Sequence, residues 1–271
     1  MAEPVETWRA TVTGPPPEAA AISLWQAGAD AVEVTATAAI GFFPVDGDDA
    51  DPPPLAAADA TVAWTRLPAE DHMAAWRAAS VPVRAGRFDL VPAHHVDSHV
   101  TPTELHRIVI DAGMAFGSGH HDTTAGCLEQ LDHVPVAGRR ILDVGTGTGI
   151  LAIAAAMAGA DTVVGVDTDP QAIEVARRNA DVNGVEVELA LGSTEVVDGP
   201  FDGVLANLLT GLLVERASDL AALVGPGGWL VASGVGIPRT PVVVAALDDA
   251  GFTDIDVHHR GDWAVLTGAR P

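Results

Sequence analysis

Three glycines at alternate positions separate an apolar segment from an alanine-rich one. Residues 141–144 are Ile-Leu-Asp-Val, Gly145, Gly147 and Gly149 follow, and residues 150–158 are rich in alanine. A turn of this kind leads from a strand into a helix. Its glycines let a ligand lie against bare backbone, and the first free N–H groups of the helix point at that ligand. We therefore expect a ligand-binding turn within an α/β fold.

A second apolar segment, residues 163–167, ends on the carboxylate of Asp167. Parallel strands present their carboxyl ends at the same edge of a sheet, so we expect Asp167 beside the glycine turn. There its carboxylate can accept hydrogen bonds from both hydroxyl groups of a ribose. The two segments together predict a site for a nucleoside cofactor.

The spacing of the glycines narrows the choice of cofactor. Dinucleotide sites typically show G-x-G-x-x-G, whereas this chain has G-x-G-x-G with Asp143 two residues before it. A carboxylate there repels phosphate and suits the ammonium group of a methionine moiety. The pattern favours S-adenosylmethionine, with Asp143 and Gly147 in the pocket. An ordinary strand–turn–helix corner and a nicotinamide site with unusual spacing remain alternatives.

The composition limits the partners of the chain. The formal net charge is −23 over 271 residues, which argues against direct binding to nucleic acid. The charge suits a basic protein partner that is attracted electrostatically. The chain also has no lysine and no tyrosine, so a biased genome composition, or a salty cytoplasm, explains the charge equally well.

We expect a soluble, cytoplasmic protein without a membrane segment, a disulfide or a metal. No apolar run approaches the ~20 residues needed to cross a bilayer, and the N-terminus lacks a signal-peptide pattern. The one cysteine, Cys127, excludes an internal disulfide and reads as a core residue. Six of the ten histidines form adjacent pairs, at 94–95, 120–121 and 258–259. Adjacent side chains point to opposite faces of an extended chain and rarely hold one metal ion.

Three regions follow from the patterns of apolar residues. Residues 1–70 predict a small α+β domain, 71–110 a partly ordered linker region, and 111–271 the nucleoside-binding domain. In the first we expect a helix at 18–27 and strands at 8–12, 32–37, 40–43 and 61–67. In the last we expect helices at 123–132, 150–158, 170–183, 212–223 and 241–250. The expected strands there are 141–144, 163–167, 185–191, 203–206, 229–232, 255–258 and 264–267. Because helices alternate with strands apolar on both faces, the pattern predicts a covered parallel sheet.

Four motifs in order resemble those of the ribosomal protein L11 methyltransferases. They are A-F-G-S-G-H-H-D-T-T at 115–124, I-L-D-V-G-T-G-T-G-I-L at 141–151, V-D-T-D-P-Q-A at 166–172 and A-N-L-L at 206–209. The first is the specific one, since the glycine and aspartate motifs occur throughout the class I methyltransferases.

The resemblance implies a class I methyltransferase (Rossmann-like) fold: a seven-stranded, mostly parallel sheet with a reversed last strand, behind a small N-terminal substrate-recognition domain. It implies cofactor contacts from Thr124, Gly145, Asp167 and Asn207. Asn207 is also the candidate catalytic residue, because its carbonyl oxygen can accept a hydrogen bond from an amine. The implied reaction transfers a methyl group to lysine or N-terminal amines of L11 or a similar basic protein.

Departures from the family pattern leave the substrate open. Ser118 stands where the family usually has threonine, and Asp122 where it often has proline. Where the family tends to carry two tryptophans, only Trp76 remains, with His72 at the other place. We therefore keep two alternatives: a methyltransferase acting on another protein or a small molecule, and a nucleoside-binding module without catalysis.

Overall fold

The chain forms two compact units in a computed structural model, residues Met1–Ala79 and Ser80–Pro271. The structure describes residues 6–14, 16–29, 31–45, 51–55, 60–67, 81–111 and 121–271. Each unit is described by itself.

The first unit is a four-stranded antiparallel sheet packed on one helix. Its elements are β1 (Thr7–Thr13), α1 (Pro17–Gln26), β2 (Ala31–Val34), β3 (Ala39–Pro44) and β4 (Thr61–Leu67), and the strand order is β2-β3-β1-β4. The order of elements is the predicted one. Alternate residues of β1 and β3, among them Ala10 and Phe43, are buried with Leu24 of α1. The helix therefore covers one face of the sheet.

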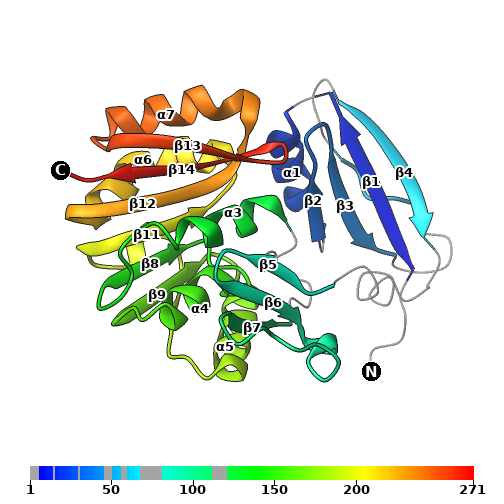
Figure 1. Ribbon diagram of the computed structural model, residues 1–271. Helices are drawn as coiled ribbons and strands as arrows, with labels where there is room; N and C mark the ends of the chain where they lie inside the picture. The colour runs from blue at the N-terminus through cyan, green and yellow to red at the C-terminus, as the bar shows by residue number, and fades with distance from the viewer. Residues whose placement is uncertain are drawn as a thin grey trace. The chain divides into compact units, whose positions relative to one another are not determined.

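The second unit is built on a seven-stranded sheet (Figure 1). Its strands, in spatial order, are β10 (Glu188–Leu191), β9 (Thr162–Asp167), β8 (Arg140–Val144), β11 (Phe201–Asn207), β12 (Val224–Gly236), β14 (Trp263–Ala269) and β13 (Thr253–Arg260). β14 runs antiparallel to both neighbours, and the pairs from β10 to β12 are parallel. The predicted mostly parallel sheet with a reversed last strand is confirmed.

Helices cover both faces of this sheet (Figure 1). On one face lie α3 (Asp122–Gln130), α4 (Ile150–Met157) and α5 (Pro170–Asn183), and on the other α6 (Thr210–Leu223) and α7 (Thr240–Asp249). Side chains of β8 alternate between them. Leu142 joins the core cluster under α6 and α7, whereas Asp143 points toward α4 and accepts a hydrogen bond from its backbone. Short 3-10 turns lie at Ala93–His95, Thr194–Val196 and Ile237–Arg239.

The predicted linker region differs most from the structure. The second unit begins at Ser80, and a small sheet of β5 (Val83–Ala85), β6 (Phe88–Pro92) and β7 (His106–Ile110) belongs to it. Every residue of β6 is buried, and β7 contacts α4 and α5. Prolines at 82, 92 and 102 are typical of a connecting segment, but two of them lie at the ends of short strands: β5 begins directly after Pro82, and β6 ends at Pro92. Residues 73–79, whose pattern predicts a short helix within the linker region, lie outside the described residues. Across the described part of the chain, no helix has the length and apolar character to span a bilayer.

A close contact between two neighbouring strands gives a test of the packing. Gly203 of β11 pairs with Trp229 of β12, and a Cβ at position 203 would lie 2.2 Å from the indole ring. The indole cannot move freely, since its Nε1 donates to the carbonyl of Pro135 at 3.0 Å. We expect Gly203→Ala to lower the free energy of unfolding by about 1–3 kcal/mol, because overpacking forces neighbouring atoms apart.

The control is Gly211→Ala in α6, where a new Cβ meets nothing within 4 Å. Alanine in a helix is favoured over glycine by about 0.5–1 kcal/mol, so this variant is expected to be at least as stable as the wild type. Urea unfolding followed by circular dichroism compares the two. Equal midpoints for both variants would contradict the packing described here.

Candidate functional site

The glycine turn lies between β8 and α4 and is packed from two sides. Gly145 and Gly149 have φ angles of 72° and 80°, which side chains disfavour. A Cβ on Gly145 would lie 2.5 Å from the side chain of Leu208, after β11. A Cβ on Gly149 would lie 3.1 Å from the Cβ of Ala176 in α5. Both positions therefore need glycine, for backbone conformation and for space.

Asp167 lies beside this turn, as predicted. Its Oδ2 accepts a hydrogen bond from the N–H of Gly147 at 2.9 Å, and its Oδ1 accepts one from the N–H of Asp169 at 3.0 Å. Asp169 in turn caps α5, with its own Oδ1 accepting from Gln171 N at 2.8 Å. The carboxylate is partly exposed, so its remaining lone pairs are accessible to hydroxyl donors.

Asp143 is a buried acid under the same turn, with 1% of its surface exposed. Its Oδ2 accepts from Thr146 Oγ1 at 2.7 Å and from Ala152 N at 3.2 Å. Its Oδ1 is buried and has no hydrogen-bond partner among the described residues. Burial raises the pKa of Asp143 to about 7; the two hydrogen bonds oppose the rise, and the charge of Asp167 adds to it.

Asn207 and Thr124 meet on the other side of β8. Asn207 ends β11, and its Nδ2 donates to Thr124 Oγ1 at 3.2 Å and to Thr123 Oγ1 at 3.3 Å. Both threonines lie in the first turn of α3, which His121 caps by accepting from Thr123 N. Since the amide nitrogen is engaged, the carbonyl oxygen of Asn207 is the part of the side chain left to accept another donor.

The register of the sheet brings the glycine turn and Asp167 to the same edge as Asn207 and Thr124. β8 lies between β9 and β11, with Asp143 opposite Gly165 on one side and Leu205 on the other. All six predicted site residues therefore surround the carboxyl ends of three adjacent strands. Their contacts to a cofactor stay a prediction.

Two polar residues of this cluster were not predicted. Thr123, like Thr124, accepts a hydrogen bond from Nδ2 of Asn207. The two adjacent threonines of the first motif could have suggested that both contribute. Thr146 donates its hydroxyl to Asp143, and a hydroxyl three residues after a buried acid could have suggested it.

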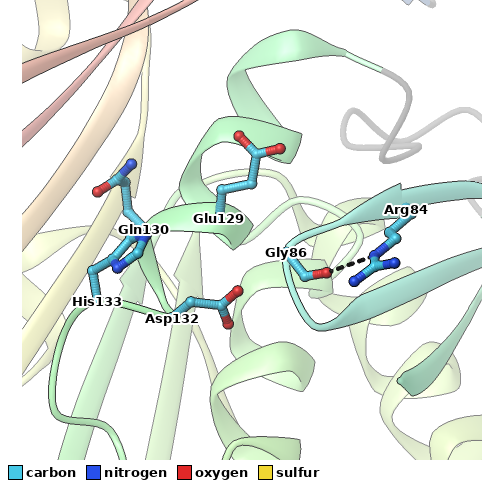
Figure 2. Close-up of a pocket in the computed structure, with 6 residues that line it drawn as sticks. All are labelled: Arg84, Gly86, Glu129, Gln130, Asp132 and His133. Carbon is cyan, nitrogen blue, oxygen red and sulfur yellow. Dashed lines mark hydrogen bonds between the residues drawn. The ribbon is translucent and has the colours of Figure 1, made fainter. Parts of the chain in front are cut away.

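A separate pocket lies at the other end of α3 (Figure 2). Its lining residues are Arg84, Gly86, Glu129, Gln130, Asp132 and His133. Two of its carboxylates are already paired with arginines, Asp132 with Arg87 and Glu129 with Arg260. Thr124 lies in the first turn of α3, whose last residues line this pocket. The pocket is therefore distinct from the six predicted site residues at the strand ends, which we call the strand-end site.

Cys127 is a fully buried core residue, as predicted. Burial raises the pKa of its thiol, and the nearby charge of Asp143 raises it further. A buried, protonated thiol is a poor nucleophile. Within the described residues, no three potential ligands lie together in a way that could hold a metal ion.

The strand order and the position of the glycine turn define the class I methyltransferase fold. The structure superposes on the ribosomal protein L11 methylase of Lactobacillus delbrueckii subsp. bulgaricus with a TM-score of 0.63 at 29% identity, over 70% of this chain and 97% of that one. A second neighbour is the 16S rRNA N2 G1207 methyltransferase of T. Thermophilus, solved with AdoMet and guanosine. It matches with a TM-score of 0.50 at 21% identity, over 58% of this chain and 46% of the other, and supports the fold alone.

The chain belongs to the ribosomal protein L11 methyltransferase (PrmA) family, whose profile matches residues 22–271. The L11 methyltransferase of Geobacter metallireducens is 41% identical over 82% of this chain and 71% of its own length. That of Geobacter sulfurreducens is 44% identical, over 73% and 65% respectively. That of Deinococcus radiodurans is 36% identical over 91% of this chain and 92% of its own. The predicted family and the predicted methyltransferase class are confirmed.

The raised pKa of Asp143 predicts a pH effect on stability. An aspartate ionises near 3.8 when exposed and near 7 in this fold, so between these values the folded state binds more protons than the unfolded state. Stability therefore falls as pH rises through this window. We expect Asp143 to contribute a loss of about 3 kcal/mol between about pH 5 and about pH 8.

Asp143→Asn keeps the shape of the side chain and cannot ionise. The variant is expected to lack this loss, which the difference between wild-type and variant unfolding free energies isolates from all other titrating groups. Urea titrations at the two pH values provide the measurement. A difference that stays constant with pH would show that Asp143 ionises normally in the folded protein.

Proposed function

We propose that this chain is an S-adenosylmethionine-dependent protein N-methyltransferase that methylates amines of ribosomal protein L11. The observation that carries the proposal is the cluster of Asp143, Gly147, Asp167, Asn207 and Thr124 at one sheet edge, in a chain of the L11 methyltransferase family. We infer the substrate from relatives of this chain that are named ribosomal protein L11 methyltransferases.

The residues of the strand-end site fit this cofactor. Asp167 is partly exposed and already oriented by two backbone N–H groups, so it can accept the ribose hydroxyls. The buried Oδ1 of Asp143 lacks a partner among the described residues, which suits a nearby ammonium group. Thr124 and Asn207 face the same edge and are assigned to the methionine part.

The chemistry asks little of the protein beyond alignment. S-adenosylmethionine supplies a methyl group already activated on a sulfonium, and the protein excludes water and orients the amine. A lysine amine, with a pKa near ~10.4, must lose a proton before it can attack, while an α-amine near ~7.7–8.0 is partly neutral at pH 7. The carbonyl oxygen of Asn207 accepts a hydrogen bond from the amine and so directs its lone pair.

The charge of the chain suits the proposed substrate. A net charge of −23 attracts a basic protein and speeds its encounter, an effect that weakens as salt is added. We assign recognition of the substrate to the first unit, whose sheet and helix form a body separate from the methyltransferase fold.

Replacing Asp167 tests the cofactor site. We expect Asp167→Ala to weaken binding of S-adenosylmethionine by about tenfold or more, because the variant loses the ribose acceptor and frees the N–H of Gly147. Asp169→Ala is the matched control. It removes a neighbouring carboxylate that caps α5, which costs about 1 kcal/mol of stability without touching the proposed site. Isothermal titration calorimetry on both variants should separate them, and equal affinities would refute the assignment of Asp167.

Methylation of L11 tests the reaction itself. Purified enzyme, S-adenosylmethionine and unmodified L11 should yield L11 heavier by one or more methyl groups in intact-mass spectra. We expect Asn207→Ala to bind L11 normally and to lower kcat by about tenfold to a hundredfold, as for the loss of one positioned polar group.

The same experiment distinguishes methylation of L11 from methylation of another protein or a small molecule. Cofactor binding by the wild type without any mass increase in L11 would refute L11 as substrate and favour another protein or a small molecule. In that case a chimera that carries the first unit of a typical family member should methylate L11.

A further inference from the structure

Helix α5 carries two asparagines, Asn179 and Asn183, one turn apart and on the same face. Each pairs its carboxamide with a backbone residue at the end of β7. Asn183 accepts from Val109 N at 2.8 Å and donates to Val109 O at 2.7 Å. Asn179 accepts from Asp111 N at 3.1 Å and donates to Asp111 O at 3.2 Å. The two side chains thus satisfy the backbone N–H and C=O groups of Val109 and Asp111, as a neighbouring strand would.

The two asparagines differ in their third hydrogen bond. Asn179 also donates from Nδ2 to the carbonyl of Thr148, inside the glycine turn, at 2.9 Å. Asn183 donates instead to the backbone of Asn179, within its own helix, at 2.7 Å. Asn179 is therefore the one of the pair that ties the turn to α5 and β7, and only 2% of its surface is exposed.

The carbonyl of Thr148 lies between two glycines of the turn, where the backbone conformation is least restricted. Thr148 follows Gly147, whose N–H donates to Asp167, and precedes Gly149, the N-cap residue of α4. Glycines give this stretch many backbone conformations, so holding one of them costs conformational entropy. A hydrogen bond from a buried side chain fixes the turn when the protein folds, so less conformational entropy is lost when the ligand binds. The preorganised turn therefore binds the ligand more tightly.

Contacts of α5 support this role. Ala176, one turn before Asn179, packs closely against Gly149, where an added Cβ would lie 3.1 Å from the Ala176 Cβ. On the other side, Asp111 is the residue directly before the segment 112–120, which carries most of the first family motif. One side chain therefore ties the glycine turn to Asp111, the residue directly after β7.

We propose that Asn179 is a positioning residue of the methyltransferase, which holds the glycine turn in the conformation that binds the cofactor. The inference rests on the proposed cofactor site. Asn183 serves the fold alone, although it makes the same number of hydrogen bonds.

The experiment compares Asn179→Ala with Asn183→Ala in the full-length protein. Each variant loses three hydrogen bonds of similar length, so we expect similar decreases in the melting temperature of the unliganded protein. The dissociation constant of S-adenosylmethionine, measured by titration calorimetry on folded protein, should rise about tenfold in Asn179→Ala. In Asn183→Ala it should stay within roughly twofold of the wild-type value.

A general loss of stability would not produce this difference. Equal dissociation constants in the two variants, whether both raised or both unchanged, would overturn the inference. If Asn179→Ala yields no folded protein, the isosteric pair Asn179→Asp and Asn183→Asp replaces it. Asn179→Asp keeps the acceptor for Asp111 N but loses the donor to Thr148, so the same rise is expected. A wild type that binds no S-adenosylmethionine would refute the proposed function instead.

Discussion

The hydrogen bond from the N–H of Gly147 to the carboxylate of Asp167 joins the glycine turn to the end of the next strand. The rest of the site depends on it, because it connects the element that follows β8 to the one that ends β9. The turn is also held from below by Asp143 through Thr146, and from α5 through Asn179. Hydrogen bonds from the protein's own side chains therefore hold this glycine-rich turn in one conformation.

Much of this arrangement could be predicted from local patterns. Asp169 before Pro170 marked the start of α5, and Gly184 marked its end, because caps depend on adjacent residues alone. The β13–β14 hairpin and the parallel strands followed from alternation and apolar runs. Strand β6 was missed, since prolines next to short strands look like a connection. The roles of Asn179 and Asn183 were also missed, because polar residues on a helix usually face solvent and their partners lie about 70 residues away.

Burial accounts for the electrostatic character of the site. Asp143 lies in the sheet core with an unused oxygen among the described residues, so its charge is costly in the folded chain. Buried acids with strongly shifted pKa values cluster at functional sites. The amide of Asn207 is oriented by two threonines, which leaves one defined acceptor at the strand ends. The acid that we assign to the cofactor thus lies in β8, and the neutral acceptor that we assign to the amine ends the adjacent strand β11.

The most direct test of this account is a crystal structure of the protein with S-adenosylhomocysteine. We predict the ribose hydroxyls within hydrogen-bond distance of the carboxylate of Asp167, and the amino-acid end between the glycine turn and Asn207. A ligand seated in the pocket of Arg84 and Asp132 at the far end of α3, or a ribose remote from Asp167, would contradict it.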